Sequence, residues 1–332
     1  MSHHARLTTA RLARQWLAVT LIGFAGFAGI ASAADYPTRP VTLIAPTAAG
    51  GAIDSAARVF AEPLSQRLGQ RLVIENRPGS NGIIGTAAVA RAQPDGHTLA
   101  FTFSTAFTTA PHLVKAMPYD PLSDFAPVTM IGRISLVLVT HPTFKAANLR
   151  EFIAAAKTAP GTIQYASGGD GSDHHLAIEM LSLAAGIKLN HVPYKSGPQG
   201  YADLLGGHVQ AMFIAPGTAA RHVKEGRINA FGVSSTGPQE GYAGVPTIGS
   251  VLPGYEYSGW FAIFAPKGTP ADIVSSLNAD FRAVLALPEV TQKFGAIGLE
   301  PTPSTPAELS ALVAADHRKI GALAKAIGLK PQ

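Results

Sequence analysis

The 332-residue sequence contains no cysteine, and only 14% of its residues are charged. The absence of cysteine excludes disulfides, thiolate metal ligands and thiol nucleophiles. Because 47% of the residues are hydrophobic, the chain lies far from the composition of disordered proteins and can bury a large core. The sequence therefore predicts a globular protein, and its length predicts two domains.

Clusters of basic residues are also missing. After residue 33 the arginines are scattered, as in Arg58, Arg67, Arg71 and Arg77. Proteins that bind nucleic acids carry a basic patch, because contacts to the phosphate backbone dominate their affinity. The sequence therefore predicts no nucleic-acid partner.

Only one stretch is apolar over a long distance. Residues 16–30 form this run, with three arginines before it and Ala31, Ser32 and Ala33 after it. The pattern is typical of an export signal, whereas an uncleaved membrane anchor is disfavoured because glycines interrupt the short run. We expect residues 1–33 to be a signal peptide cleaved after Ala33, and the mature protein to be periplasmic. That compartment lacks a nucleotide pool, so no cofactor is expected.

The rest of the chain alternates short apolar runs with helical patterns. VTLIAP (41–46), RLVIEN and HTLAFTF are expected strands, and five similar runs follow before SGWFAIFAP at 258–266. After the first strand, apolar residues recur at helical spacing up to Leu68, and Pro63 predicts a kink or an early end of that helix. This alternation predicts an α/β fold with two lobes, whose ligands bind where strands run into helix N-termini.

The loop PTAAGG joins the first strand to the first helix. Gly50 and Gly51 allow close approach to a ligand, and the amides of the helix start favour an anion. The alternative is an ordinary tight turn that binds nothing. Asp54 is interpreted as a cap or dipole partner and not as a ligand contact.

The stretch FTFSTAFTTAP leads from a strand into small hydroxyl residues. Ser104 and Thr105 can donate hydrogen bonds into a cleft, and Phe103 and Phe107 can form an apolar wall. The alternative is turn chemistry beside core phenylalanines.

A third loop, in GGDGSDHHLAIEM (168–180), again precedes a helix, with Asp170, Ser172 and Asp173 as candidate N-caps. A metal site is disfavoured, because His174 and His175 diverge by about 100° on a helix and no HExxH spacing is present. A serine hydrolase is disfavoured because there is no G-x-S-x-G elbow. Two anion-friendly helix starts without a catalytic group indicate capture without chemistry.

Six motifs together carry a family resemblance: ENRPGSNGIIG, PDGHTLAF, MPYDPLSDFAPV, NHVPYKSG, DLLGGHVQAMF and SGWFAIFAPKGTP. In this order they resemble the Bug family, the periplasmic solute-binding receptors similar to those of tripartite tricarboxylate transporters. The resemblance implies a two-lobed, type II-like flytrap, with lobe 2 (140–259) inserted into lobe 1 (34–139 plus 260–332). The two crossover strands of the hinge would lie near Val139–Pro142 and Tyr257–Phe261.

The resemblance also implies a ligand, a partner and a site. The ligand is a small carboxylate held through amides, hydroxyls and waters, and the partner is a membrane permease; the receptor is expected to be a monomer without metal or enzymatic activity. The implied ligand residues are Thr47, Ala49, Gly50, Gly51, Ser104, Thr105, Phe107, Gly168, Gly169, Asp170, Gly171, Ser172, Ile214, Ala215 and Pro216.

Departures from the family pattern bear on the ligand. Many members carry an aspartate after Met-Phe, where this chain has Ile214 and then Ala215. Without this acid an ammonium group has no partner, so an amino acid is disfavoured and a dicarboxylate is favoured, an aromatic one included. Ile214 is alternatively part of the strand's core face. Two other functions stay open, a sensor that presents the carboxylate to a signalling partner and a periplasmic hydrolase.

Overall fold

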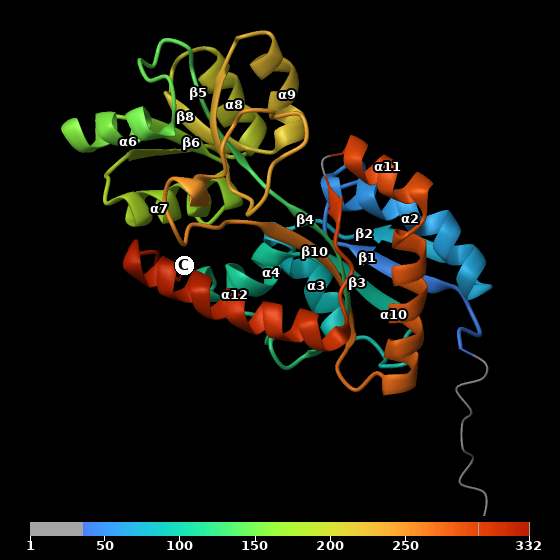
Figure 1. Cartoon of the computed structure of the whole chain (residues 1–332). Coiled ribbons are helices and arrows are strands. Elements are labelled where there is room, and N and C mark those ends of the chain that lie inside the picture. The colour runs from blue at the N-terminus through green and yellow to red at the C-terminus, as the bar shows by residue number, and fades with distance from the viewer. Residues whose placement is uncertain (1–35, 298, 332) are drawn as a thin grey trace, which may run out of the picture. The chain divides into compact units, whose positions relative to one another are not determined.

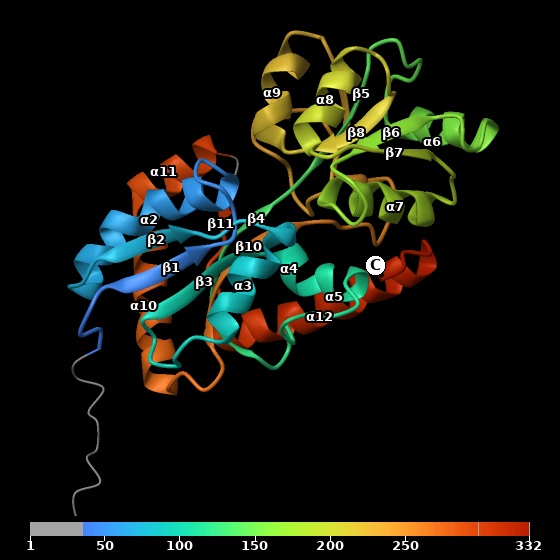
Figure 2. The same cartoon turned by 180° about the vertical axis from the view of Figure 1, so that it is seen from behind.

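The computed structural model describes residues 36–297 and 299–331 of the chain (Figures 1 and 2). The expected signal peptide, residues 1–33, lies outside the described residues. Among the helices of the described part, none is both long and apolar enough to cross a membrane.

The first sheet has six strands in the order β11-β4-β10-β3-β1-β2. The three N-terminal strands are parallel, as β-α-β connections require, whereas β10 runs antiparallel to β3 and β4. The strands are β1 Val41–Ala45, β2 Leu72–Asn76, β3 Thr98–Phe103, β4 Phe125–Ile134, β10 Gly259–Pro266 and β11 Glu300–Pro301. Their helices are α2 Ala52–Leu68, α3 Ile83–Ala90, α4 Ser104–Thr108, α5 Ala110–Leu113, α10 Ala271–Leu285, α11 Pro288–Ala296 and α12 Pro306–Ala326.

The second sheet has five strands in the order β7-β6-β8-β5-β9. Here β6 is parallel to β7 and β8, and β5 is antiparallel to β8 and β9. The strands are β5 Val137–Thr140, β6 Gln164–Ser167, β7 Asn190–Pro193, β8 Ala211–Ile214 and β9 Asn229–Val233. Their helices are α6 Leu149–Thr158, α7 Asp173–Ala185, α8 Gly197–Leu205 and α9 Pro216–Lys224.

The chain crosses between the sheets twice, and the first crossing differs from expectation. It leaves the first sheet after Ile134 and enters the second at Val137, because β5 pairs with β8 and β9. Val139–Pro142 is therefore not the crossing, since the residues up to Thr140 belong to the second sheet. The chain returns between Val233 and Gly259. Which sheet an apolar run joins depends on its pairing partners, and the run itself does not encode them.

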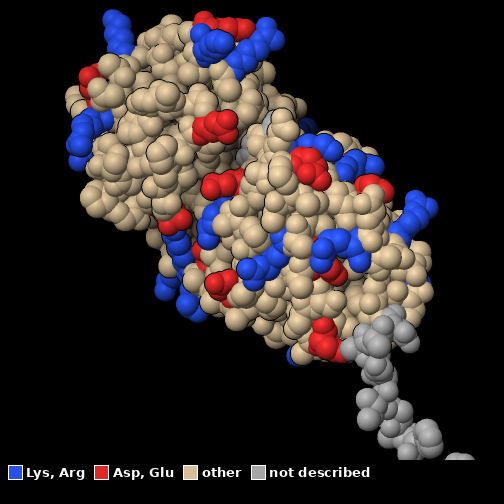
Figure 3. Space-filling view, turned by 45° about the vertical axis from the view of Figure 1, so that its right-hand side comes forward, with Lys and Arg blue, Asp and Glu red and all other residues tan. Residues whose placement is uncertain are grey.

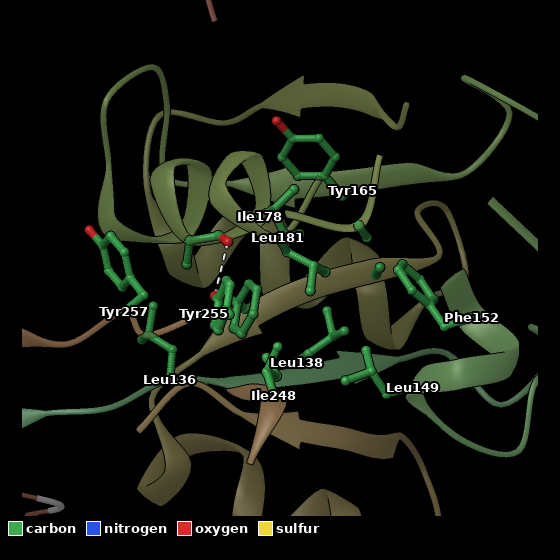
Figure 4. Close-up of a cluster of buried hydrophobic side chains, with 14 of the residues drawn as sticks. Leu136, Leu138, Leu149, Phe152, Tyr165, Ile178, Leu181, Ile248, Tyr255 and Tyr257 are labelled. Atoms are coloured by element: carbon green, nitrogen blue, oxygen red, sulfur yellow. Dashed lines mark hydrogen bonds between the residues drawn. The ribbon is translucent and has the colours of Figure 1, made fainter. Parts of the chain in front are cut away.

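Each sheet has its own apolar core. In the core of the second sheet, Leu138, Phe152 and Leu181 pack together, and the Tyr255 hydroxyl donates to the Ala177 carbonyl at 3.0 Å (Figure 4). Two residues near the C-terminal end of α12, Ile320 and Leu323, belong to this same core, although most of α12 covers the first sheet (Figure 1). This helix therefore contributes apolar surface to both cores.

Helix α2, which follows β1, ends at the glycine that its sequence indicates, but its proline does not end it. It runs through Pro63 to Leu68, so an early end at Pro63 was wrong. Gly69 then adopts the left-handed conformation (φ 66°, ψ 8°) that commonly ends helices.

Candidate functional site

A cavity of about 340 Å³ lies between segments that follow β3 and β6. Its volume is in the range of small-ligand sites, roughly 300 to 1,000 Å³. We call it the glycine-loop cavity, after the glycine loop Gly168–Ser172 on one of its walls. Its lining residues are Ser80, Ile83, Phe103, Thr105, Thr109, Ala110, Leu113, Val114, Gly168, Asp170, Gly171, Ser172, Asp173, His174 and Gly197.

The glycine loop joins β6 to α7 and needs two glycines. Gly169 and Gly171 have φ values of 105° and 73°, which side chains rarely adopt. Ser172 is the N-cap of α7, because its side chain accepts from the His175 amide and donates to the Gly169 carbonyl at 2.7 Å. Of the three candidate caps, serine is therefore the one used.

Most amides of the glycine loop donate to other protein atoms. The Gly169 amide donates to Ser167 Oγ and the Gly171 amide to His175 Nδ1, each at 3.0 Å. In contrast, no protein acceptor among the described residues takes the amides of Asp173 and His174, in the first turn of α7. The helix start, more than the glycines, thus offers donors to an anion.

Behind the glycine loop lies a cluster of side chains that the sequence did not indicate. The rings of His175 and His191 stack at 4.1 Å and 6°, and His191 Nδ1 lies 3.5 Å from Asp170 Oδ1. On its other side, His191 Nε2 lies 2.6 Å from Ser167 Oγ. The sequence indicates only that His191 lies in a strand. Its contact with His175 arises because β7, which contains His191, pairs with β6.

The possible metal ligands of Asp170, His175 and His191 lie within 4.8 Å of one another. Stacked rings hold their lone pairs in parallel planes, whereas a metal needs lone pairs that converge on one point. In addition, His175 Nδ1 already accepts from the Gly171 amide. The arrangement therefore suits a packed pair of neutral rings better than a metal site.

Burial controls the charge of both histidines. It is the main cause that lowers the pKa of His175 to about 4; the neighbouring His191 adds to this lowering and Asp170 opposes it. Burial likewise lowers the pKa of His191. Both rings are therefore neutral at pH 7.

His174 points away from this cluster, as helix geometry predicts for adjacent residues. A Cβ added at Gly197 would stand 2.9 Å from its Cε1 atom. Its Nδ1 is buried and has no hydrogen-bond partner among the described residues, and the same holds for Oγ1 of Thr109 on the opposite wall. Burial also lowers the pKa of His174. Two residues that line the cavity thus each contain a buried polar atom without a partner among the described residues.

Some residues at the end of β3 and in the segment after it line the cavity, and others pack into the core. Thr105 and Phe103 line the glycine-loop cavity, whereas the buried Ser104 accepts a hydrogen bond from the Trp260 amide. Phe107 is fully buried and stacks on Phe264 at 4.2 Å. The expected apolar wall is therefore formed by Phe103 and not by Phe107, which the short helix α4 turns into the core.

The loop Thr47–Gly51 lines neither of the two cavities described here. Asp54 holds it: the carboxylate accepts from the Gly50 amide at 2.8 Å, from Asn76 at 3.1 Å and from Arg58 at 2.9 and 3.0 Å. The Arg58 hydrogen bond is the main cause that lowers the pKa of Asp54 to about 2. Asp54 is thus a structural partner of the helix start, as interpreted from the sequence.

Strand β8 leads to a second cavity of about 750 Å³, which we call the crossover cavity. Pro216 lines it, together with Arg133 near the end of β4 and Ser258 just before β10. Ile214 is 5% exposed and belongs to a core cluster, while Ala215 is the N-cap of α9. The structure therefore places Ile214 on the strand's core face, the alternative left open by the sequence, and Ile214 lines neither of the two cavities.

The charges at the glycine-loop cavity are acidic. Asp170 and Asp173 line it, and no lysine or arginine of the described residues does. The Tyr257 hydroxyl donates to Asp173 at 2.6 Å, and the Asp170 side chain is 55% exposed to screening water. On the face in Figure 3, acidic and basic side chains are interspersed and neither sign forms a continuous patch.

The comparison with protein families decides the identity. Residues 56–329 match the family model described as the tripartite tricarboxylate transporter family receptor. The chain belongs to this family. It is therefore a solute-binding receptor, and the resemblance deduced from the six motifs is confirmed.

Individual relatives agree with this assignment. The receptor is 36% identical to the protein BugT of Bordetella pertussis over 311 residues, which cover 93% of this chain and 95% of BugT. Among solved structures it is similar to R. palustris Rpa4515 with adipate (32% identity, TM-score 0.77, 90% of this chain and 100% of that one). It is also similar to MatC from Rhodopseudomonas palustris with bound malate (28% identity, TM-score 0.72, 87% and 99%). The expected two-lobed binding-protein fold is thus confirmed.

Proposed function

We propose that this receptor works in the periplasm, where it captures a small dicarboxylate in the glycine-loop cavity and delivers it to the permease of a tripartite tricarboxylate-type transporter. The observation that carries the proposal is a cavity lined by residues whose hydrogen-bonding groups have no partner among the described residues, namely Thr109, whose Oγ1 is buried, on one wall and the first amides of α7 on the other. Two similar proteins were solved with adipate and malate, both of which are dicarboxylates.

In this proposal, uncharged hydrogen-bond donors recognise the two carboxylates of the ligand. One carboxylate accepts from the hydroxyls of Thr105 and Thr109, and the other from the first amides of α7, whose helix dipole favours an anion. Charge-assisted hydrogen bonds contribute about 1.5 to 3 kcal/mol each, so both ends together reach the roughly 8 kcal/mol of micromolar affinity. The hydrocarbon or aromatic part of the ligand would lie against the apolar lining residues Phe103, Leu113 and Val114.

Two lobes that close on the ligand complete the mechanism. We place the hinge where the chain crosses between the sheets, at 134–137 and 257–259, since Tyr257 still belongs to the core of the second sheet. Closure would bring Thr47–Gly51 toward the ligand and would let Oγ1 of Thr47, which is buried and has no partner among the described residues, donate to it. The receptor acts as a monomer, and its ligand leaves chemically unchanged.

A thermal-shift screen of residues 34–332 tests the proposal. Adipate, malate and phthalate are expected to raise the melting temperature, because a ligand that binds only the native state stabilises it. Calorimetry then compares their affinities with those of aspartate and glucose. Tight binding of aspartate or glucose, with none of the dicarboxylates, would contradict the assignment.

A further inference from the structure

Three side chains hold the glycine loop without lining its cavity. Ser167 at the end of β6 accepts from the Gly169 amide, and His175 in α7 accepts from the Gly171 amide. His191 of β7 then contacts both supports, through its 2.6 Å hydrogen bond to Ser167 and its 4.1 Å stack on His175. The shape of the ligand-facing loop thus depends on two imidazole rings behind it.

The hydrogen bond to His175 requires one protonation state. The Gly171 amide can only donate, so Nδ1 of His175 must carry no proton, and the neutral ring carries its proton on Nε2. Protonation of Nδ1 would place two donors opposite each other and leave the Gly171 amide without its acceptor. A second positive charge on His191 would repel the first across the stack.

The charged and titratable groups around the pair come from three elements. Asp170 of the glycine loop lies 3.5 Å from His191 Nδ1 and favours its protonation. The Tyr165 ring of β6 stacks on His191 at 4.8 Å, and its hydroxyl donates to Glu179 of α7 at 2.5 Å. Burial outweighs the nearby carboxylates, because the pKa values of both histidines are lowered.

We propose that His175 and His191 are positioning residues that make ligand binding by this receptor depend on external pH. The loop holds the ligand while both rings are neutral, and acidification releases the Gly171 amide and weakens binding. This inference rests on the proposed function for its ligand, but the response of the loop to pH does not need one.

Variants that cannot be protonated test the coupling. In His175→Asn, the side-chain oxygen can accept from Gly171 as Nδ1 does, and in His191→Gln the amide can reach Ser167 as Nε2 does. Adipate affinity is measured by calorimetry between pH 7.5 and 4 for the wild type and the double variant. The wild type is expected to lose about twofold more affinity than the double variant at pH 4, where about half of the His175 rings are protonated, because adipate's own protonation affects both proteins equally.

His222→Asn is the matched control, because the replaced ring forms one hydrogen bond, with the Tyr201 hydroxyl, away from the glycine loop. It should keep the wild-type pH profile. Equal pH profiles for the wild type and the double variant would overturn the proposal.

A second measurement needs neither variants nor ligand. In the ligand-free wild-type protein, the NMR resonance of the Gly171 amide is expected to titrate together with the His175 ring, with a midpoint near pH 4. A Gly171 resonance that stays unchanged while the His175 ring titrates would refute the coupling even if no dicarboxylate binds. Failure of adipate, malate and phthalate to bind at every pH, with Gly171 titrating as expected, would instead refute the proposed function alone.

Discussion

Gly171 of the glycine loop lies directly against Leu113 of α5. A Cβ built at Gly171 would stand 2.1 Å from Leu113 Cδ1 and 3.3 Å from Thr109 Cγ2. The second-sheet part of the chain therefore approaches the first-sheet part at a point where any side chain on the loop would collide. Gly171 and Leu113 both line the glycine-loop cavity.

Gly171→Ala is expected to weaken dicarboxylate binding at least tenfold, because the added methyl group displaces α5 and also strains a residue at φ 73°. Gly186→Ala is the matched control at the other end of α7, with φ 61° and nothing within 4 Å of the added Cβ. Calorimetry with adipate compares the two. Equal affinities for both variants would show that the contact with Leu113 does not shape the site.

Thr109→Val is expected to weaken dicarboxylate binding about tenfold while leaving stability nearly unchanged, because one hydrogen bond to a charged group is lost and none within the protein. Thr140→Val is the control, since Thr140 Oγ1 is likewise buried and unpartnered but lies in β5, outside the cavity. Titration calorimetry and melting temperatures are measured for both. A Thr109→Val receptor with wild-type affinity would remove Thr109 from the site.

Asp54→Asn is expected to lower the free energy of unfolding at pH 7 by about 1 to 2 kcal/mol, part of the effect being screened because Arg58 is 60% exposed. The pKa of Asp54 falls from 3.8 to about 2 on folding, so its contribution is present above pH 3.8 and is lost as the pH falls through 2. Urea unfolding at pH 7 and pH 2 measures the difference. Glu225→Gln, in an exposed pair of the same i,i+4 spacing, should change little.

The lowered pKa of His175 predicts that the folded protein loses stability in mild acid. Its pKa of about 4 in the folded protein lies below the ordinary value of 6.5, so the unfolded chain binds more protons between these pH values. The free energy of unfolding should therefore fall as the pH drops through this window, by about 2 kcal/mol at pH 5. Urea unfolding of the wild type and His175→Asn from pH 7.5 to 4.5 checks this. Parallel curves for the two proteins would show that His175 is not the group responsible.

Much of the local structure could be predicted from the sequence. The strand and helix alternation, the serine cap of α7 and the glycine that ends α2 follow rules that act within a few residues. The crossing at Ile134–Val137 did not follow, because the membership of β5 in the second sheet depends on strands more than seventy residues farther along the chain. For the same reason, the packing of Phe107 on Phe264 did not follow from the sequence, because these residues lie far apart in the chain.

The family, the α/β class and the glycine-rich loops before the helices follow from the sequence alone, because motif order, apolar period and glycine placement are properties of the chain. Only the tertiary structure decided which side chains meet. His191 joins His175 and Asp170 because β7 pairs with β6, and Leu113 meets Gly171 because α5 packs against the glycine loop. Such contacts depend on long-range pairing and close packing, which residue patterns a few positions long do not encode.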